Sequence, residues 1–168
     1  MQVLVIRHAI AEDPEAFAAS GLDDTQRPLT ARGRRRMRLG VRGLRAVVRR
    51  VDLLASSSLV RARQTADIVA ASYRRAERAE VEALAPDAAP AVFLEWLATQ
   101  TGRDVVAVVG HEPSLSAIVT WLVAGRTDPV IELKKGAACL VDFAGPVAAG
   151  RGVIRWALTP GQLRRLGG

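Results

Sequence analysis

Short aliphatic runs alternate with stretches of helical periodicity along this chain, and that alternation strongly limits how it can fold. The runs are typical of β-strands, whereas the intervening stretches repeat their apolar residues at helical spacing. Strands separated by helices form a mostly parallel sheet that is covered on both faces. We therefore expect a three-layer α/β/α sandwich. The predicted strands span 3–6, 51–55, 105–109, 137–143 and 153–158.

The helix predicted after Thr30 has the clearest pattern. Thr30 can cap its first turn, and Met37, Val41, Leu44 and Val48 recur at spacings of four, three and four, which gives one buried face. The predicted helices span 30–50, 59–74, 88–100 and 113–124, and a short terminal helix begins at Thr159–Pro160.

The length of 168 residues favours one domain, spanning 1–168, and an apolar fraction of 49% can supply its core. The single cysteine, Cys139, excludes an internal disulfide framework. The opening apolar run is too short for a signal peptide or a membrane span, and Arg7 interrupts it. We expect a cytoplasmic, monomeric protein that does not bind membranes.

The net charge is +7, and nearly all of the basic residues are arginine. A basic surface attracts nucleic acid, acidic proteins or phosphorylated ligands, although arginine-rich usage also follows from a GC-rich genome. Five arginines form a stripe on the 30–50 helix, and the favoured interpretation is a solvated face. No aromatic platform or zinc finger accompanies them, so a nucleic-acid-binding module is a distant alternative. The stripe consists of Arg34, Arg38, Arg42, Arg45 and Arg49.

The only two histidines occupy equivalent positions after two predicted strands. His8 follows the strand 3–6 after one residue, and His111 follows the strand 105–109 after one glycine. In open α/β sheets the ligand site lies beyond the carboxyl ends of the strands. Both histidines are therefore expected at the functional edge of the sheet.

A zinc site is one reading of these residues, because two histidines and Glu112 could supply three ligands. Arg7 adjoins His8, however, and a guanidinium beside a dication is electrostatically unfavourable. The sequence therefore favours an anion site that holds no metal.

A third segment with similar chemistry is "SSSLVRARQTAD", residues 56–67. Ser57 or Ser58 can cap the helix that follows, which places Arg61 and Arg63 in its first turns. A cation there opposes the helix dipole by roughly 0.3–1 kcal/mol, so each arginine is either solvated at this small cost or neutralised by a bound anion. Together with Arg7 and the histidines, Arg61 indicates phosphoryl chemistry.

Four motifs resemble the histidine phosphatase superfamily, in order and in spacing. They are "RHA" at 7–9, "RPLTARG" at 27–33, "SSSLVRARQT" at 56–65 and "VVGHEPSLS" at 108–116. The short length and the early "RPLTARG" look most like the small SixA-type phosphohistidine phosphatase branch. The resemblance implies a phosphoglycerate mutase-like fold and a phosphohistidine intermediate. Ala9 stands where the superfamily usually has glycine.

The resemblance also implies roles for individual residues. His8 would attack phosphorus, and Arg7, Arg61 and His111 would bind the transferring oxygens. Glu112 resembles the position of the proton donor in the acid phosphatase branch, although it could instead simply begin the following helix. Arg27 and Arg63 are further candidates for substrate contact. No cofactor is expected. Carboxylates in the loop after His8 could also move inward; they are Glu12, Asp13, Asp23 and Asp24.

The candidate lid over this site, residues 9–26, is only moderately long. We therefore expect a shallow, open pocket that suits a phosphohistidine on a partner protein. A broad-specificity phosphatase of small phosphoesters is the main alternative. A mutase is disfavoured, because retaining phosphate against water requires a closed site.

Overall fold

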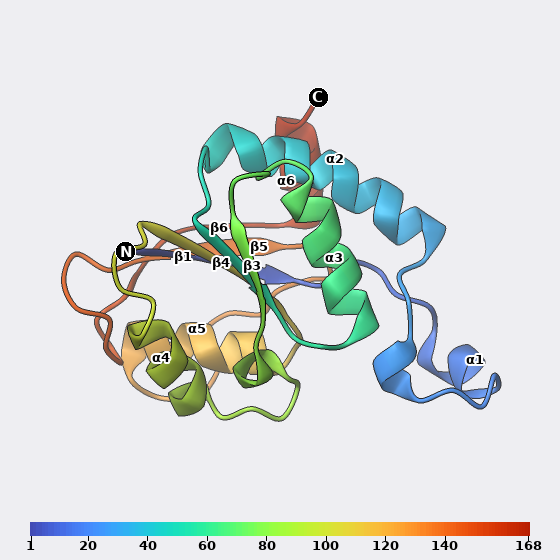
Figure 1. Ribbon diagram of the computed structural model, residues 1–168, viewed down its shortest axis with the longest axis horizontal. Coiled ribbons are helices and arrows are strands. Elements are labelled where there is room, and N and C mark those ends of the chain that lie inside the picture. The colour runs from blue at the N-terminus through green and yellow to red at the C-terminus, as the bar shows by residue number, and fades with distance from the viewer.

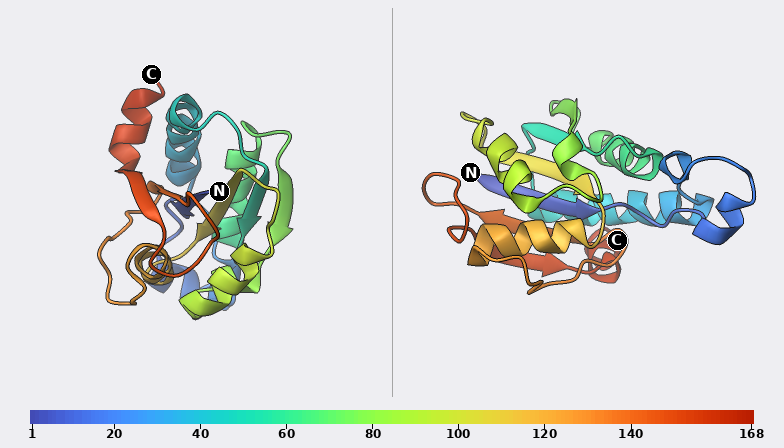
Figure 2. Two further views of the ribbon diagram at one scale, coloured as in Figure 1. Left: turned by 90° about the vertical axis from the view of Figure 1, so that its left-hand side faces the viewer. Right: turned by 90° about the horizontal axis from the view of Figure 1, so that it is seen from below.

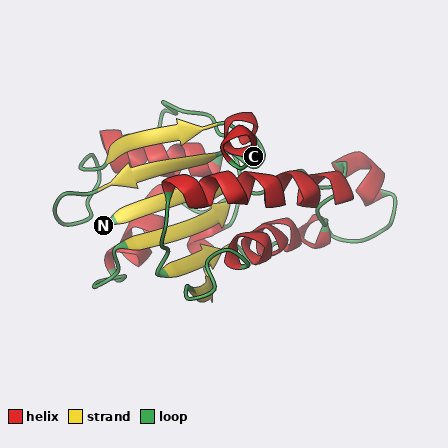
Figure 3. Ribbon diagram, turned by 90° about the horizontal axis from the view of Figure 1, so that it is seen from above, coloured by secondary structure: helices red, strands yellow, loops and turns green.

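A six-stranded sheet runs through the middle of the protein, and helices cover both of its faces (Figures 1 and 3). The computed structural model describes all 168 residues. The strand order is β3-β2-β4-β1-β5-β6; the first four strands in this order are parallel, β5 is antiparallel to β1, and β6 is antiparallel to β5. The predicted three-layer sandwich with a mostly parallel sheet is confirmed. The strands are β1 (Gln2–Arg7), β2 (Leu53–Ser56), β3 (Glu77–Glu80), β4 (Val105–Gly110), β5 (Ala138–Asp142) and β6 (Val153–Leu158).

Helices lie on opposite faces of the sheet (Figure 2), and a hydrophobic core layer lies between the sheet and the helices on each face. Strand β1 contributes to both, because alternate side chains of a strand point to opposite faces. Leu4 and Ile6 belong to one layer, and Val3 and Val5 to the other. No helix is both long enough and apolar enough to cross a bilayer. One face carries α2 (Ala31–Val47), α3 (Val60–Ala70) and α6 (Pro160–Leu166), and the other carries α4 (Pro90–Ala98) and α5 (Ser114–Ala124).

Two helices end earlier than the sequence pattern predicts. Helix α2 ends at Val47 instead of Arg50, and α3 ends at Ala70 instead of Arg74. After each of these helices the chain turns so that Val48 and Tyr73 are buried, and the Tyr73 hydroxyl donates to the Val48 carbonyl at 2.8 Å. Tertiary packing at this end of the molecule therefore outweighs helix propensity.

The edge strand β3 has the sequence "ERAE" and was not predicted. It pairs with β2 in parallel, but its side chains are largely exposed and three of the four are charged. A strand without apolar alternation carries no periodic signal. Charged side chains are nevertheless suited to a sheet edge, because they discourage pairing with another chain.

Helix α6 packs closely against α2 at two glycines. A Cβ atom at Gly43 would overlap the Leu163 carbonyl group, whereas one at Gly40 would lie 3.8 Å from the Leu163 Cβ, an ordinary contact. Of these two glycines in α2, only Gly43 is therefore required by the close approach of the two helices.

We expect Gly43→Ala to lower the free energy of unfolding by about 1–3 kcal/mol, because the extra methyl group overpacks this contact. Gly40→Ala is the matched control and should be neutral or stabilising by up to about 1 kcal/mol, since alanine favours the helix. Urea denaturation of both variants measures the difference. Equal stabilities would show that the helices are not in this close contact.

Candidate active site

The two histidines leave adjacent parallel strands at the same level. Arg7 at the end of β1 is in register with Gly110 at the end of β4, and the His8 amide donates to the Gly110 carbonyl at 3.0 Å. The ring centroids of His8 and His111 are consequently 5.1 Å apart. The two residues are only 6% and 2% exposed. The structure thus brings both imidazoles together beneath the surface.

The tautomer of His8 is set by its backbone partner. Its Nδ1 lies 2.7 Å from the Ala9 carbonyl oxygen, which can only accept, so Nδ1 carries the proton and Nε2 keeps a lone pair. Burial lowers the pKa of His8 to about 4, and the charges of Arg61, Arg7 and Lys135 act in the same direction. At neutral pH the ring is therefore uncharged and Nε2 can act as a nucleophile.

His111 has one occupied and one free ring nitrogen. Its Nε2 lies 2.6 Å from the hydroxyl oxygen of Ser57, which is fully buried, and its Nδ1 has no hydrogen-bond partner. Burial, followed by the neighbouring His8 and Arg61, lowers the pKa of His111 to about 3. A neutral ring that accepts from Ser57 at Nε2 presents an N–H donor at Nδ1.

The contact of Ser57 with His111 corrects the prediction that Ser57 or Ser58 caps α3. The cap residue is Leu59, and no side chain bonds to the first amides of the helix. The Ser57 hydroxyl cannot cap the helix, because Ser57 directly follows β2 and its side chain contacts the His111 imidazole. Arg61 does lie in the first turn of α3, as the sequence predicts.

Two arginines flank the histidines, Arg61 buried and Arg7 partly buried, and both are held mainly by backbone oxygens. Arg7 donates from Nη1 to the Leu133 carbonyl at 2.6 Å. Arg61 is 6% exposed, and its Nη1 donates to the Asp24 carbonyl at 2.9 Å and lies 3.1 Å from Asp24 Oδ2. The Nε of each arginine is buried without a partner.

These unpartnered nitrogens are concentrated at one place. Four buried side-chain polar atoms in the protein have no hydrogen-bond partner, and three belong to Arg7, Arg61 and His111. Buried polar groups almost always have partners, so a cluster of exceptions requires an explanation. Three free donors around a neutral imidazole are suited to the oxygens of an anion.

Asp24 is the carboxylate nearest to this cluster. It bridges Arg61 and Arg27, with Oδ1 2.6 Å from Arg27 Nε, and the hydrogen bond from Arg27 is the main cause that lowers its pKa. Arg27 is 8% exposed and also donates to the Glu12 carbonyl at 2.8 Å. The Asp24 side chain is 56% exposed, so it lies between Arg61 and solvent. The protein's own carboxylate thus covers part of Arg61, where we expected an open approach.

Glu112 makes contacts with backbone and helix. Its Oε2 accepts from the Ser116 hydroxyl at 2.6 Å, and its Oε1 accepts from the Leu133 amide at 2.9 Å. The Leu133 carbonyl in turn accepts from Arg7. Glu112 therefore fixes the backbone segment that holds Arg7, a connection that sequence spacing does not reveal.

Arg63 lies differently from what the sequence suggests. It is half-exposed and lies 3.5 Å from Glu80 on the edge strand, so the structure does not bring it to the histidines. Lys135, in contrast, is close enough to His8 to lower its pKa. The next residue, Gly136, donates its amide to the Arg7 and His8 carbonyls, which attaches this turn to the site.

No three His, Cys, Asp or Glu side chains lie close enough together to hold a metal ion. The groups gathered at this site are guanidinium cations, N–H donors and the unprotonated Nε2 of His8.

Comparison with known proteins shows to which family the chain belongs. The family model of the histidine phosphatase superfamily (branch 1) matches residues 3–85. A relative from Picosynechococcus, named only as an uncharacterized protein, is 33% identical over 80% of this chain and 81% of its own. The chain belongs to the histidine phosphatase superfamily. Within it, similarity to SixA in sequence and in fold assigns the chain to the SixA-type branch.

The chain is similar to SixA over nearly its whole length, both in sequence and in fold. The phosphohistidine phosphatase SixA of Escherichia coli is 28% identical over 98% of this chain and 97% of its own. A solved structure of the protein histidine phosphatase SixA complexed with tungstate has a TM-score of 0.81 at 27% identity, covering 97% of this chain and 99% of that one. The superfamily match includes Arg7, His8 and Arg61, and the fold places His111 beside them.

We expect the free energy of unfolding to decrease as the pH falls from about 6.5 toward 4. In the folded protein burial lowers the pKa of His8 to about 4 and of His111 to about 3, whereas an unfolded histidine titrates near 6.5. In this range the unfolded chain binds more protons, so acid favours unfolding. His8→Asn should reduce this pH dependence by roughly half, because one of the two groups is removed. Urea midpoints at several pH values measure it, and an unchanged slope would contradict a buried, neutral His8.

Proposed function

We propose that this protein is a phosphohistidine phosphatase that works through a phosphorylated His8, with a phosphohistidine on a partner protein as its substrate. The observation that carries the proposal is the cluster of buried donors without partners on Arg7, Arg61 and His111, around an imidazole whose Nε2 is free. No metal or cofactor is part of this proposal.

In the first step the lone pair of His8 Nε2 attacks phosphorus. A nitrogen–phosphorus bond forms to His8 while the bond from phosphorus to the leaving imidazole breaks. The electron pair of that bond stays with the leaving nitrogen, which is protonated by solvent. The proton of His8 stays on Nδ1, hydrogen-bonded to the Ala9 carbonyl oxygen, so that hydrogen bond stabilises the positive charge that develops on the ring.

Arg7, Arg61 and His111 counter the negative charge of the transferring oxygens. This charge is spread over the equatorial oxygens in the transition state, and fixed donors in a dry site stabilise it without reorganising. A bound phosphoryl group also favours the protonated form of His111, since an opposite charge raises the pKa of an imidazole.

In the second step water attacks the phosphorus of phospho-His8. The nitrogen–phosphorus bond breaks, its electron pair returns to Nε2, and the proton of the attacking water leaves with inorganic phosphate or to solvent. The free enzyme is regenerated with the same His8 tautomer.

The form of the loop after His8 supports a protein substrate. This loop contains α1 (Pro14–Ala18) and the short 3-10 helix η1 (Asp24–Gln26). Helix α1 buries none of its residues and projects away from the sheet (Figure 1). No apolar lid therefore encloses a small substrate, and a partner surface reaches Arg61 once the exposed Asp24 carboxylate moves. Small phosphoesters could enter by the same route.

Rapid quenching tests the intermediate. With a radiolabelled phosphohistidine peptide, we expect label on His8 that is stable in alkali and lost in acid. His8→Ala should abolish this label and lower kcat by about a thousandfold or more. A chromatographic check for inorganic phosphate, rather than an isomerised product, separates a phosphatase from a mutase. Normal turnover by His8→Ala would eliminate the proposal.

Glu112 can be tested with two substrates. A positioning role through Leu133 and Arg7 predicts that Glu112→Gln lowers kcat/KM for an aryl phosphate and an alkyl phosphate by similar factors, because both require Arg7. We expect this result. A loss confined to the alkyl phosphate would instead support the proton-donor role that the sequence suggests, since an alkoxide must be protonated as it leaves, whereas an aryl oxide leaves with little assistance.

A further inference from the structure

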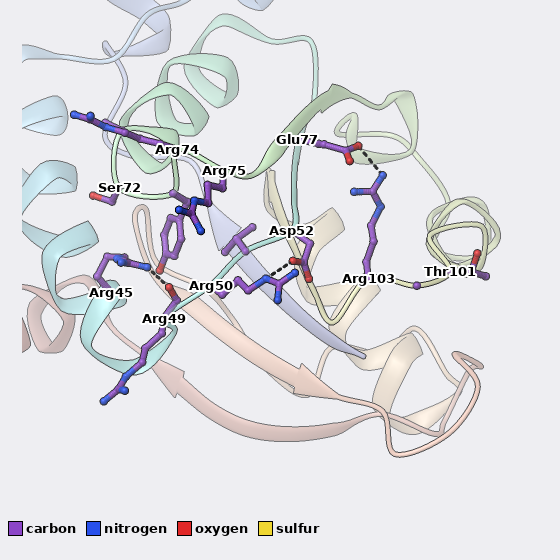
Figure 4. A pocket seen from close by; sticks show the side chains of 14 residues that line it. Arg45, Arg49, Arg50, Asp52, Ser72, Arg74, Arg75, Glu77, Thr101 and Arg103 are labelled. Carbon is purple, nitrogen blue, oxygen red and sulfur yellow. Dashed lines mark hydrogen bonds and ion pairs between the residues drawn. The ribbon is translucent and has the colours of Figure 1, made fainter.

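A second basic region lies at the opposite end of the sheet, where β2 and β4 begin. It is a cavity of about 1040 Å³ between the end of α2, the turn after α3 and the turn before β4 (Figure 4). Its lining is mostly polar, with only three hydrophobic residues. Six arginines line it: Arg45, Arg49, Arg50, Arg74, Arg75 and Arg103.

Two carboxylates lie among these arginines, and both are already engaged. Asp52 is 2.6 Å from Arg50 Nε and also accepts from the Asp104 and Val105 amides, and Glu77 is 2.8 Å from Arg103. The cavity lining keeps a net charge of +4, more than half of the +7 of the whole chain. Its other four arginines have no carboxylate partner: Arg45, Arg49, Arg74 and Arg75.

The fold itself does not require so many cations here. Helices α2 and α3 end at this cavity, and a helix C-terminus favours a neighbouring cation. One arginine at each of the two helix ends would meet that preference. Additional guanidinium groups repel one another, so the excess positive charge indicates an external anion.

We propose that this cavity binds a small molecule that carries several phosphoryl groups. The guanidinium fork matches phosphate oxygens in two-point contacts, and the cavity has the volume of small-molecule sites. Arg45 and Arg75 lie on the same side of the hollow, and Arg49 and Arg74 extend at its rim (Figure 4). A chain of phosphoryl groups can contact several of them at once.

Recognition in this cavity depends on charge and not on stacking. Tyr73 is the only aromatic residue in the lining, and it is buried, with Arg45 over its ring at 5.1 Å and its hydroxyl bonded to Val48. No free aromatic face is available for the bases of a single-stranded nucleic acid. A small polyanion therefore fits this cavity better than a nucleic acid does.

The proposed site is separate from the histidine cluster and does not depend on the proposed reaction. Strand β2 begins at Leu53, next to the cavity, and ends at Ser56, next to the Ser57 that contacts His111. The two basic regions thus lie at opposite ends of the same strands. A ligand bound in the cavity leaves the catalytic groups free.

Titration of the isotopically labelled full-length protein with tripolyphosphate, followed by amide NMR spectra, tests the proposal. Orthovanadate present throughout occupies the histidine site. We expect saturable shifts at residues 49–52, 72–76 and 101–104, and Arg74→Ser/Arg75→Ser should weaken binding about tenfold or more, because two charged contacts are lost. Arg35→Ser/Arg38→Ser removes the same charge from an exposed face of α2 and should leave the affinity within about twofold.

Several results would overturn the proposal. They are shifts confined to the histidine site, shifts that never saturate, and equal weakening by both double variants, which would mean that tripolyphosphate senses only the net charge. Binding of an RNA oligonucleotide or an acidic peptide at these residues, without binding of tripolyphosphate, would assign the cavity to a macromolecule instead. The spectra of the variants show directly whether each is folded.

Discussion

The parallel pairing of β1 with β4 is the constraint on which the candidate site depends. Arg7 is in register with Gly110, and a histidine follows each of these residues. The two imidazole rings therefore lie close to each other. Neither histidine could reach the other if the register differed by two residues, since each residue advances a strand by about 3.3 Å. The buried aliphatic strands thus determine the geometry of a site that contains almost none of their own side chains.

Burial of cations is the cost of this arrangement, and the fold offsets it with backbone oxygens. Arg7 is held by the Leu133 carbonyl, and Arg61 by the Asp24 carbonyl together with a single exposed carboxylate. Carbonyl partners leave the charge of a guanidinium largely uncompensated. The same positive field, added to burial, lowers the pKa of both histidines and keeps the His8 ring neutral at neutral pH.

Features that depend on the local residue pattern and on where the strands end, namely the buried strands and the relative position of the two histidines, could be predicted from the sequence. Buried strands have a strong apolar signal, and the rule that sites lie at their carboxyl ends placed His8 and His111 correctly relative to each other. The edge strand β3 has no such signal, because its residues face solvent. Contacts between distant segments were also beyond prediction: Ser57 bonds to His111 instead of capping its helix, and Glu112 reaches Leu133. These partners depend on how loops return to the sheet, which residue spacing does not encode.

Asp24 makes the burial of Arg61 compatible with ligand exchange. Its carboxylate gives Arg61 an anionic partner in the free protein, so the guanidinium is never left buried without one, a situation that is strongly unfavourable. The pair is half-exposed on the Asp24 side, however, and exposed ion pairs are worth only about 0–1 kcal/mol. A phosphoryl group carries more charge than a carboxylate, and Asp24 leaves the Nε of Arg61 without a partner. For the proposed reaction, we therefore expect exchange of carboxylate for phosphate to favour the ligand without requiring Arg61 to be desolvated again.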